Sequence, residues 1–179
     1  MKRRLLGMIL TAVMLSAAVS PALAAGEETF AFQADSGKTA TFLMQTVTRP
    51  YPGTVGGEWT MIGLARGTTR MPDSYIETYL EQMAQLLAET RGDLTRNKYS
   101  EYSRLILALT ALGEDPRDVW GYDLTAKLAD LDMVERQGIN GPAYALIALN
   151  SGEYEIPKAP QGKVQTTRAG LVEAILSSE

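Results

Sequence analysis

The chain has 179 residues, of which 17 are basic and 21 acidic, and it contains neither cysteine nor histidine. The missing residue types exclude disulfides, thiol nucleophiles, histidine bases and the usual zinc sites built from nitrogen and sulfur ligands. The acidic balance argues against a nucleic-acid partner, because phosphate binding needs a basic patch.

The first 24 residues have the order of segments that marks a cleavable secretory signal. Three cationic residues at positions 2–4 precede an apolar stretch from Leu5 to Val19, and Ala22-Leu23-Ala24 supplies the small residues of a cleavage site. The apolar stretch is shorter than the roughly 20 residues of a membrane span, and nothing similar follows it. We therefore expect cleavage after Ala24, a protein secreted to the exterior or to the cell surface, and no membrane span in the mature chain.

The mature chain of 155 residues is long enough for one domain with a hydrophobic core. Loss of the signal removes three basic residues, which leaves 14 basic against 21 acidic residues and a formal charge of −7. Residues 25–37 show no helical period and are expected to form a spacer. Residues 38–179 are broken by glycine and proline in the manner of connected helices, so we expect one helical repeat domain there.

Three stretches of this domain share one pattern: GEWTMIGLARG, SEYSRLILALTALG and GPAYALIALNSG. Each has an early aromatic residue, becomes apolar, ends at a glycine and has a proline a few residues further on. The aromatic residues are Trp59, Tyr102 and Tyr144, spaced by 43 and 42 residues. A fixed period of this size is what two helices and their turns occupy in a helical repeat.

The stretches that precede the apolar ones, residues 38–49, 72–90 and 122–135, are amphipathic. A helix that is apolar nearly all round must be covered on nearly every side, whereas an amphipathic helix keeps one face in water. We therefore predict an all-α fold of about seven helices in two layers, with the apolar helices inside and residues 61–65, 105–112 and 143–149 buried. The seventh helix begins near residue 166. The predicted buried stripes of the outer helices are Tyr75, Tyr79, Met83 and Leu87, and then Leu124, Leu128 and Leu131.

The stretches GGEWTMIGLARG, YSEYSRLILALTALGEDPRDVWGYDL and QGINGPAYALIALNSGEYEIP resemble the α/α-toroid repeats of the terpenoid cyclase and prenyltransferase superfamily. They resemble the version of these repeats found in secreted bacterial prenyltransferase or squalene oxidase repeat proteins. The resemblance covers residues 38–179 and implies a toroid of helical hairpins, a fold shared by transcobalamin-type carriers, which bind rather than catalyse. A closed toroid of this superfamily has more helices than the seven predicted, so we expect an incomplete one. It would be a fragment lacking C-terminal repeats, or an open arc that needs a partner.

The residues do not match the enzymes of that superfamily. The resembling protein prenyltransferases hold zinc with Asp, Cys and His, and two of those residue types are missing here. The resembling cyclases protonate their substrate from an Asp-x-Asp-Asp motif, whose nearest match is Asp130-Leu131-Asp132. Residues two apart on a helix point in different directions, so these two carboxylates cannot converge on one substrate atom. We expect them to be solvated instead. No catalytic residue, metal site or cofactor is therefore predicted.

A candidate site follows from the repeat. If each inner helix follows an outer one with the same hand, the inner helices run parallel and their N-terminal ends gather at one rim. Aromatic residues beside a few polar groups at a concave surface are typical of a small-molecule site. Two alternatives are that the aromatic residues are core packing and that the glutamates are ordinary first-turn acids. Arg104, on an otherwise apolar helix, should be paired with a rim carboxylate. The predicted rim residues are Glu58, Trp59, Glu101, Tyr102, Arg104, Gln137, Asn140 and Tyr144.

The function expected from these observations is that of a secreted, non-catalytic binding module. It would hold a small hydrophobic or corrinoid-like ligand, or a protein partner, at the rim or concave face. One alternative is an enzyme of the cyclase or prenyltransferase kind with carboxylates as its acids and bases, and another is a structural spacer in a larger cell-surface protein. The missing histidine and cysteine favour binding, because acid–base and covalent catalysis draw on those residue types.

Overall fold

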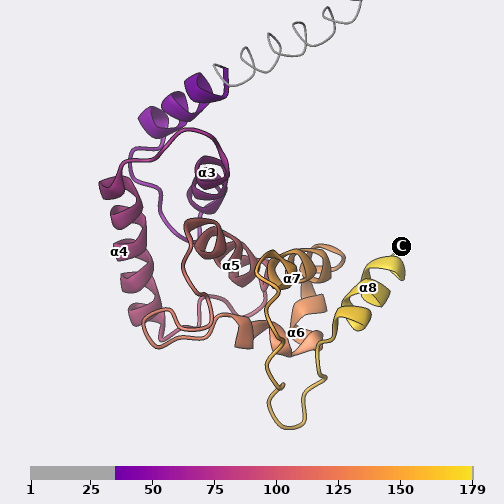
Figure 1. The fold of residues 1–179 in the computed structure, drawn as a ribbon. Coiled ribbons are helices and arrows are strands. Elements are labelled where there is room, and N and C mark those ends of the chain that lie inside the picture. The colour runs from indigo at the N-terminus through magenta and orange to yellow at the C-terminus, as the bar shows by residue number, and fades with distance from the viewer. Residues whose placement is uncertain (1–34, 179) are drawn as a thin grey trace, which may run out of the picture.

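The computed structural model describes residues 35–178, so the predicted signal peptide, its cleavage site and most of the spacer lie outside the described residues. Over this range the chain forms seven α-helices and no strand, which confirms the all-α class. The helices follow one another along a curved row (Figure 1). None of the helices in this range is both long and apolar enough to cross a lipid bilayer.

The first described helix covers residues 35–46 and so includes the last three residues assigned to the spacer. Two short three-ten segments, Thr125–Ala129 and Glu135–Gln137, lie on either side of α6. The remaining α-helices are α3 (Val55–Arg66), α4 (Asp73–Thr90), α5 (Ser100–Leu112), α6 (Leu131–Val134), α7 (Asn140–Ser151) and α8 (Arg168–Leu176).

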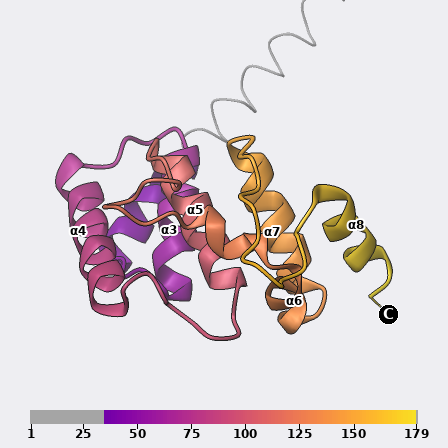
Figure 2. The same cartoon turned by 90° about the horizontal axis from the view of Figure 1, so that it is seen from below.

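Helices α3, α5 and α7 lie side by side and run parallel, as predicted. Their N-terminal ends meet, because Glu58 of α3 faces Arg104 of α5 and the backbone N–H of Ser100 donates to Gln137, just before α7. The C-terminal ends of α5 and α7 also meet, because Ser151 of α7 donates to Thr110 of α5. Figure 2 shows this row from below, with α4 beside α3 at one end and α8 at the other.

Helix α4 covers α3 and α5 on the outside of the curve (Figure 1) with the stripe that the sequence predicts. Tyr79, Met83 and Leu87 are fully buried, and the half-buried Tyr75 donates from its hydroxyl to the carbonyl of Val47 at 2.6 Å. Every fourth residue of a helix returns to nearly the same face, so this spacing produces one continuous contact with the inner layer.

The predicted burial of the inner helices is only partly correct. Met61, Leu105, Leu109 and Leu149 are buried, but Ile147 is 55% exposed and Leu107 is half-buried. The inner helices are covered by the outer layer and by one another, while the side facing the inside of the curve has no cover among the described residues. A helix in an open arc therefore keeps one face in solvent even when its sequence is apolar all round.

The outer segment 122–135, predicted as a single amphipathic helix, is divided into shorter elements. The carboxylate of Asp123 accepts hydrogen bonds from the N–H groups of Thr125 and Ala126, which starts a short three-ten turn. Asp130 is extended and pairs with Gln165, which interrupts the helix before α6. The predicted stripe still faces inward: Leu124 and Leu128 are fully buried, and Leu131 is half-buried.

The expectation that Asp130 and Asp132 are solvated is wrong for Asp130. That residue is 8% exposed and lies 3.4 Å from the ammonium of Lys163, whereas Asp132 is exposed. The burial arises because the chain around residues 164–166 bonds to the backbone of residues 129–131 and covers this side chain. The two carboxylates therefore lie in different environments.

Candidate functional site

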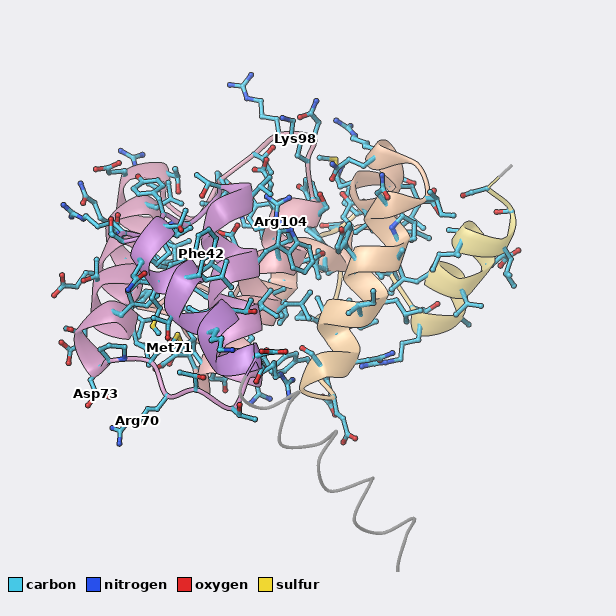
Figure 3. All side chains as sticks on the ribbon, turned by 90° about the horizontal axis from the view of Figure 1, so that it is seen from above. Phe42, Arg70, Met71, Asp73, Lys98 and Arg104 are labelled. Atoms are coloured by element: carbon cyan, nitrogen blue, oxygen red, sulfur yellow. The ribbon has the colours of Figure 1, made fainter. Side chains whose placement is uncertain are left out.

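The candidate site is a row of three side chains on the inside of the curve. Trp59, Arg104 and Tyr144 are each the fifth residue of their helices, α3, α5 and α7. Because these helices are parallel neighbours, equivalent positions come to the same level. The rings of Trp59 and Tyr144 meet with centroids 6.0 Å apart, at the level of Arg104 on the helix between them. Figure 3 looks down on this side and places Arg104 between the N-terminal helices and α7.

A buried carboxylate lies directly behind Arg104. Glu58 is 0% exposed, and its Oε1 accepts a 2.6 Å hydrogen bond from the N–H of Gly53 and a 3.5 Å one from the Tyr79 hydroxyl. Its Oε2 lies 3.7 Å from Nε of Arg104, whose side chain is 16% exposed. This separation is an ion pair but is too long for a hydrogen bond. Both Oε2 and Nε are buried and have no hydrogen-bond partner among the described residues.

Burial decides the electrostatics of this pair. Removal from water raises the pKa of Glu58 above its ordinary value of 4.5, although the Gly53 N–H and the charge of Arg104 both oppose the rise. The pKa of Tyr79 is raised well above 10.0 by burial and by the neighbouring carboxylate. Each buried charge would be costly without the other, so the ion pair lowers the cost of burying both side chains. Neither side chain is fully hydrogen-bonded.

Apolar side chains surround the row on the same face. Val55, one helical turn before Trp59, is 71% exposed, and Ile147, nearly one turn after Tyr144, is 55% exposed. Residues spaced by three or four positions share a helix face, so these side chains continue the surface that Trp59 begins. Exposed apolar side chains and a cation therefore lie near one another on this side of the helices, which makes it a candidate interaction surface.

Tyr102 does not belong to this surface. It is fully buried, and its hydroxyl accepts a hydrogen bond from the N–H of Leu94 at 2.9 Å, so it belongs to the core. The 43- and 42-residue spacing aligned Tyr102 with Trp59 and Tyr144, but the helix starts align Arg104 with them instead. The core-packing alternative is therefore correct for Tyr102 and incorrect for Trp59, which is 40% exposed.

The other predicted rim residues lie at the N-terminal ends but outside the row. Gln137 uses its side-chain oxygen to accept from the Ser100 N–H at 2.8 Å and so completes the start of α5. Glu101 is half-buried in the first turn of α5, and Asn140 is exposed at the start of α7. Within residues 35–178, no side-chain hydrogen bond or ion pair joins Glu101 or Asn140 to the other predicted residues.

Sequence reasoning missed two parts of the site, Tyr79 and the N–H of Gly53. Both satisfy Glu58, and both come from elements that were assigned other roles. Tyr79 was predicted only as a core residue of the outer helix, and nothing in the sequence shows that its hydroxyl reaches an inner-layer carboxylate. One signal was available for the helix start: Thr54 precedes Gly57 at the spacing of an N-cap, and its hydroxyl accepts from that N–H at 3.0 Å.

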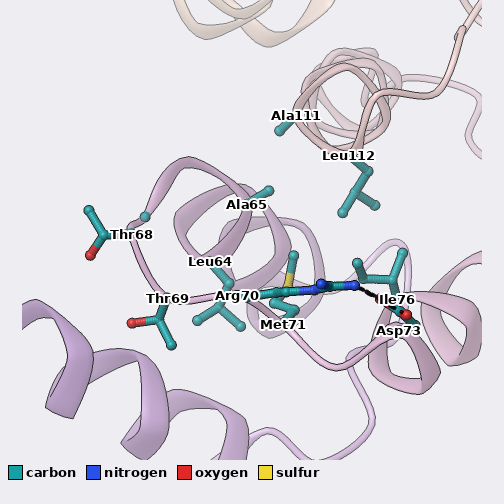
Figure 4. A pocket seen from close by; sticks show the side chains of 11 residues that line it. Leu64, Ala65, Thr68, Thr69, Arg70, Met71, Asp73, Ile76, Ala111 and Leu112 are labelled. Atoms are coloured by element: carbon teal, nitrogen blue, oxygen red, sulfur yellow. Dashed lines mark hydrogen bonds and ion pairs between the residues drawn. The ribbon is translucent and has the colours of Figure 1, made fainter.

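A separate hollow of about 310 Å3 lies at the opposite end of α3 and α5 (Figure 4). Its floor is apolar, and the ion pair of Arg70 and Asp73, at 3.1 Å, lies at its mouth. Both of these side chains are largely exposed and pair with each other. No rim residue lines this hollow, and it lacks the unpartnered buried atoms of the inner face.

The inner face combines charged, aromatic and aliphatic groups. It offers one guanidinium, two aromatic rings and an apolar surface, with a carboxylate that is enclosed behind the guanidinium. Over the described part of the chain, no three side chains of the Asp, Glu, His or Cys types group together as a metal site would require. Comparisons with known proteins found no match: no family model, curated protein or solved structure is significantly similar to this chain.

Proposed function

We infer that this protein is a non-catalytic binding module that holds a small, largely apolar ligand on the inside of its curved row of helices. The observation that carries this proposal is the Trp59–Arg104–Tyr144 row, in which a partly exposed cation lies between an exposed tryptophan and a half-buried tyrosine. The exposed aliphatic side chains of Val55 and Ile147 lie one turn away on the same helices. Such a surface fits a ligand with an apolar body and a single polar group. Secretion, which the N-terminal residues lead us to expect, would place this ligand outside the cell.

The enzyme alternative has less support from the same geometry. A general acid or base must reach the atom whose proton it moves. Glu58 is the acid nearest to the row, but it is enclosed by Gly53, Tyr79 and Arg104 and has no exposed surface. It is therefore positioned to hold Arg104 rather than to act on a ligand.

Trp59 supplies the test, because its ring is part of the row. The chain has a second tryptophan, Trp120, so titrations are made in a Trp120→Phe background in which Trp59 is the only emitter. Decan-1-ol, decanoate and dicyanocobinamide serve as apolar and corrinoid probes. At least one probe should change the emission saturably, and Tyr144→Ala or Arg104→Ala should weaken its binding by about 1–3 kcal/mol.

The matched control is Arg70→Ala, which removes an arginine from the opposite end of the inner layer and should leave binding unchanged. A loss of binding in Arg70→Ala alone would assign the ligand to the hollow at the C-terminal ends. If none of the three probes changes the emission, or if product appears when a prenyl diphosphate is added, the binding-module proposal is wrong.

A further inference from the structure

The last described helix, α8, has an apolar face that no other described element covers. The helix packs on α7 and buries Leu171 completely. On its other side Val172 is 43% exposed, Leu176 is 79% exposed and Ala169 is also exposed. These three residues are spaced by three and four positions, so they share one face of the helix. A hollow of about 630 Å3 lies along this face.

Glu173 is the free charge of the α8 face. Arg168 also lines the hollow, but its guanidinium donates to the side chain of Asn150 and to the carbonyls of Leu149 and Tyr154, so it is bound to α7 and the turn that follows. Among the described residues, no side-chain hydrogen bond or ion pair engages the carboxylate of Glu173. The α8 face is therefore apolar with one available acidic group.

The helix of residues 35–46, at the opposite end of the curved row, also has an uncovered face (Figure 1). Phe42 is 64% exposed and borders a hollow of about 500 Å3. The charged side chain of this hollow is Lys38, which pairs with Asp35 at 3.2 Å. Because these two side chains are 79% and 75% exposed, their ion pair is weak and Lys38 can meet another anion.

We propose that these two faces bind each other in different copies of the chain, so that α8 of one molecule packs on helix 35–46 of the next. Leu176 enters the hollow beside Phe42, and Glu173 faces Lys38. The two faces lie at opposite ends of one row, so each molecule in such a pair still has one free end (Figure 1). A head-to-tail contact of this kind continues from copy to copy until the assembly closes into a ring or forms an open chain.

The charges favour this head-to-tail contact over a symmetric one. Two α8 faces would bring Glu173 against its own copy, and two first-helix faces would do the same with Lys38. Only the pairing of unlike ends brings the opposite charges together, and such complementarity selects the partner more than it adds affinity. Burial of Val172, Leu176 and Phe42 provides the driving force. In proteins built from stacked helices, a terminal helix without a polar outer face leaves such a stacking surface open.

The first experiment measures the mass of the unaltered protein by sedimentation velocity over a range of concentrations. The mass should rise above that of the monomer as the concentration increases. Phe42→Gln and Leu176→Gln should each weaken self-association about tenfold, because an amide would be buried without a partner. The matched control is Ile139→Gln, which alters a 47% exposed residue outside both faces and should change nothing. Far-UV circular dichroism checks that all variants are folded.

A mixture of the two variants is the decisive test. Phe42→Gln retains an intact α8 face, and Leu176→Gln retains an intact first-helix face. Each variant alone should be monomeric at concentrations where the mixture forms dimers that contain one copy of each. These dimers should not grow further, because both of their free ends are altered.

The charges supply an independent check. Glu173→Lys should weaken self-association about threefold, the effect of one exposed ion pair. Lys38→Glu added to the same chain should restore it, because the pair is then reversed.

Four results would overturn the inference. The unaltered protein could remain monomeric at every concentration, or Phe42→Gln could associate as well as the unaltered protein, which would indicate a symmetric contact between α8 helices. The mixture could form no dimers, or the charge reversal could fail to restore association. None of these results bears on ligand binding at the inner face, which is measured separately from Trp59 emission.

Discussion

The two ends of the inner layer differ in how their polar side chains are hydrogen-bonded. At the C-terminal end, polar side chains are hydroxyls: Thr110 bonds to the Tyr154 hydroxyl at 2.8 Å, donates to the Ile106 carbonyl and is approached by Ser151. At the N-terminal end, Glu58 and Arg104 are ions that leave two buried atoms unbonded. Hydroxyls can donate and accept, so they complete one another. The carboxylate and the guanidinium, 3.7 Å apart, do not form a hydrogen bond with each other. These two unbonded atoms distinguish the N-terminal end from the C-terminal end.

The largest expected effect on stability comes from close backbone packing at the start of α3. A Cβ atom on Gly57 would collide with the backbone carbonyl of Tyr51, so Gly57→Ala should lower the free energy of unfolding by about 3 kcal/mol or more. Urea denaturation followed by circular dichroism measures the change. The control is Gly63→Ala in the same helix, where a Cβ meets nothing within 4 Å and alanine should add up to about 1 kcal/mol of stability. Equal effects of the two substitutions would show that the start of α3 is not closely packed.

The second effect is a dependence of stability on pH that Glu58 contributes at the N-terminal end. Burial raises the pKa of Glu58 in the folded state above its ordinary 4.5, so the folded protein binds this proton at higher pH than the unfolded chain does. The resulting contribution to stability is fully present below 4.5 and is lost as the pH rises through the folded-state pKa. The difference in free energy of unfolding between the unaltered protein and Glu58→Gln should therefore decrease from pH 4.5 toward neutrality.

Urea titrations of both proteins across that range measure this difference, and groups common to the two cancel. A difference that increases with pH would mean that attraction to Arg104 and the Gly53 hydrogen bond outweigh the burial of Glu58.

The smallest effect belongs to the C-terminal end. Tyr154→Phe removes one hydroxyl from the Thr110 cluster but leaves Thr110 bonded to Ile106, so the cost should be about 1 kcal/mol, the usual net value of a hydrogen bond. Thermal and urea unfolding give the change, with the exposed Tyr51→Phe as a control. Binding of decan-1-ol should not change. A loss of binding in Tyr154→Phe would mean that the two ends are not independent.

The sequence was sufficient to predict the helical class, the parallel inner helices, the buried stripe of α4 and the pairing of Arg104 with a rim carboxylate. These features depend on periodicity and on the cost of an unpaired charge, which are local properties. The aromatic spacing predicts that Tyr102 lies level with Trp59 and Tyr144, whereas the structure places Arg104 there. The register is in fact set by where each helix starts, and α5 starts without a side-chain cap that would mark the position.

Two further differences arise from contacts between distant segments. Asp130 is buried by the chain near residue 165, and no local pattern around residue 130 indicates that contact. The exposure of Ile147 follows from the open side of the curved row. The apolar character of α7 was correctly identified, but composition does not tell which face of a helix will lack a neighbour.

The contact of Trp59 with Tyr144 has a mechanical consequence. These rings belong to α3 and α7, which lie on either side of α5 (Figure 1). Their contact therefore links the two outer helices of this three-helix segment directly. Straightening the segment would draw the rings apart, and sharper bending would press them together. We therefore expect the fluorescence of Trp59 to depend on the curvature of this three-helix segment.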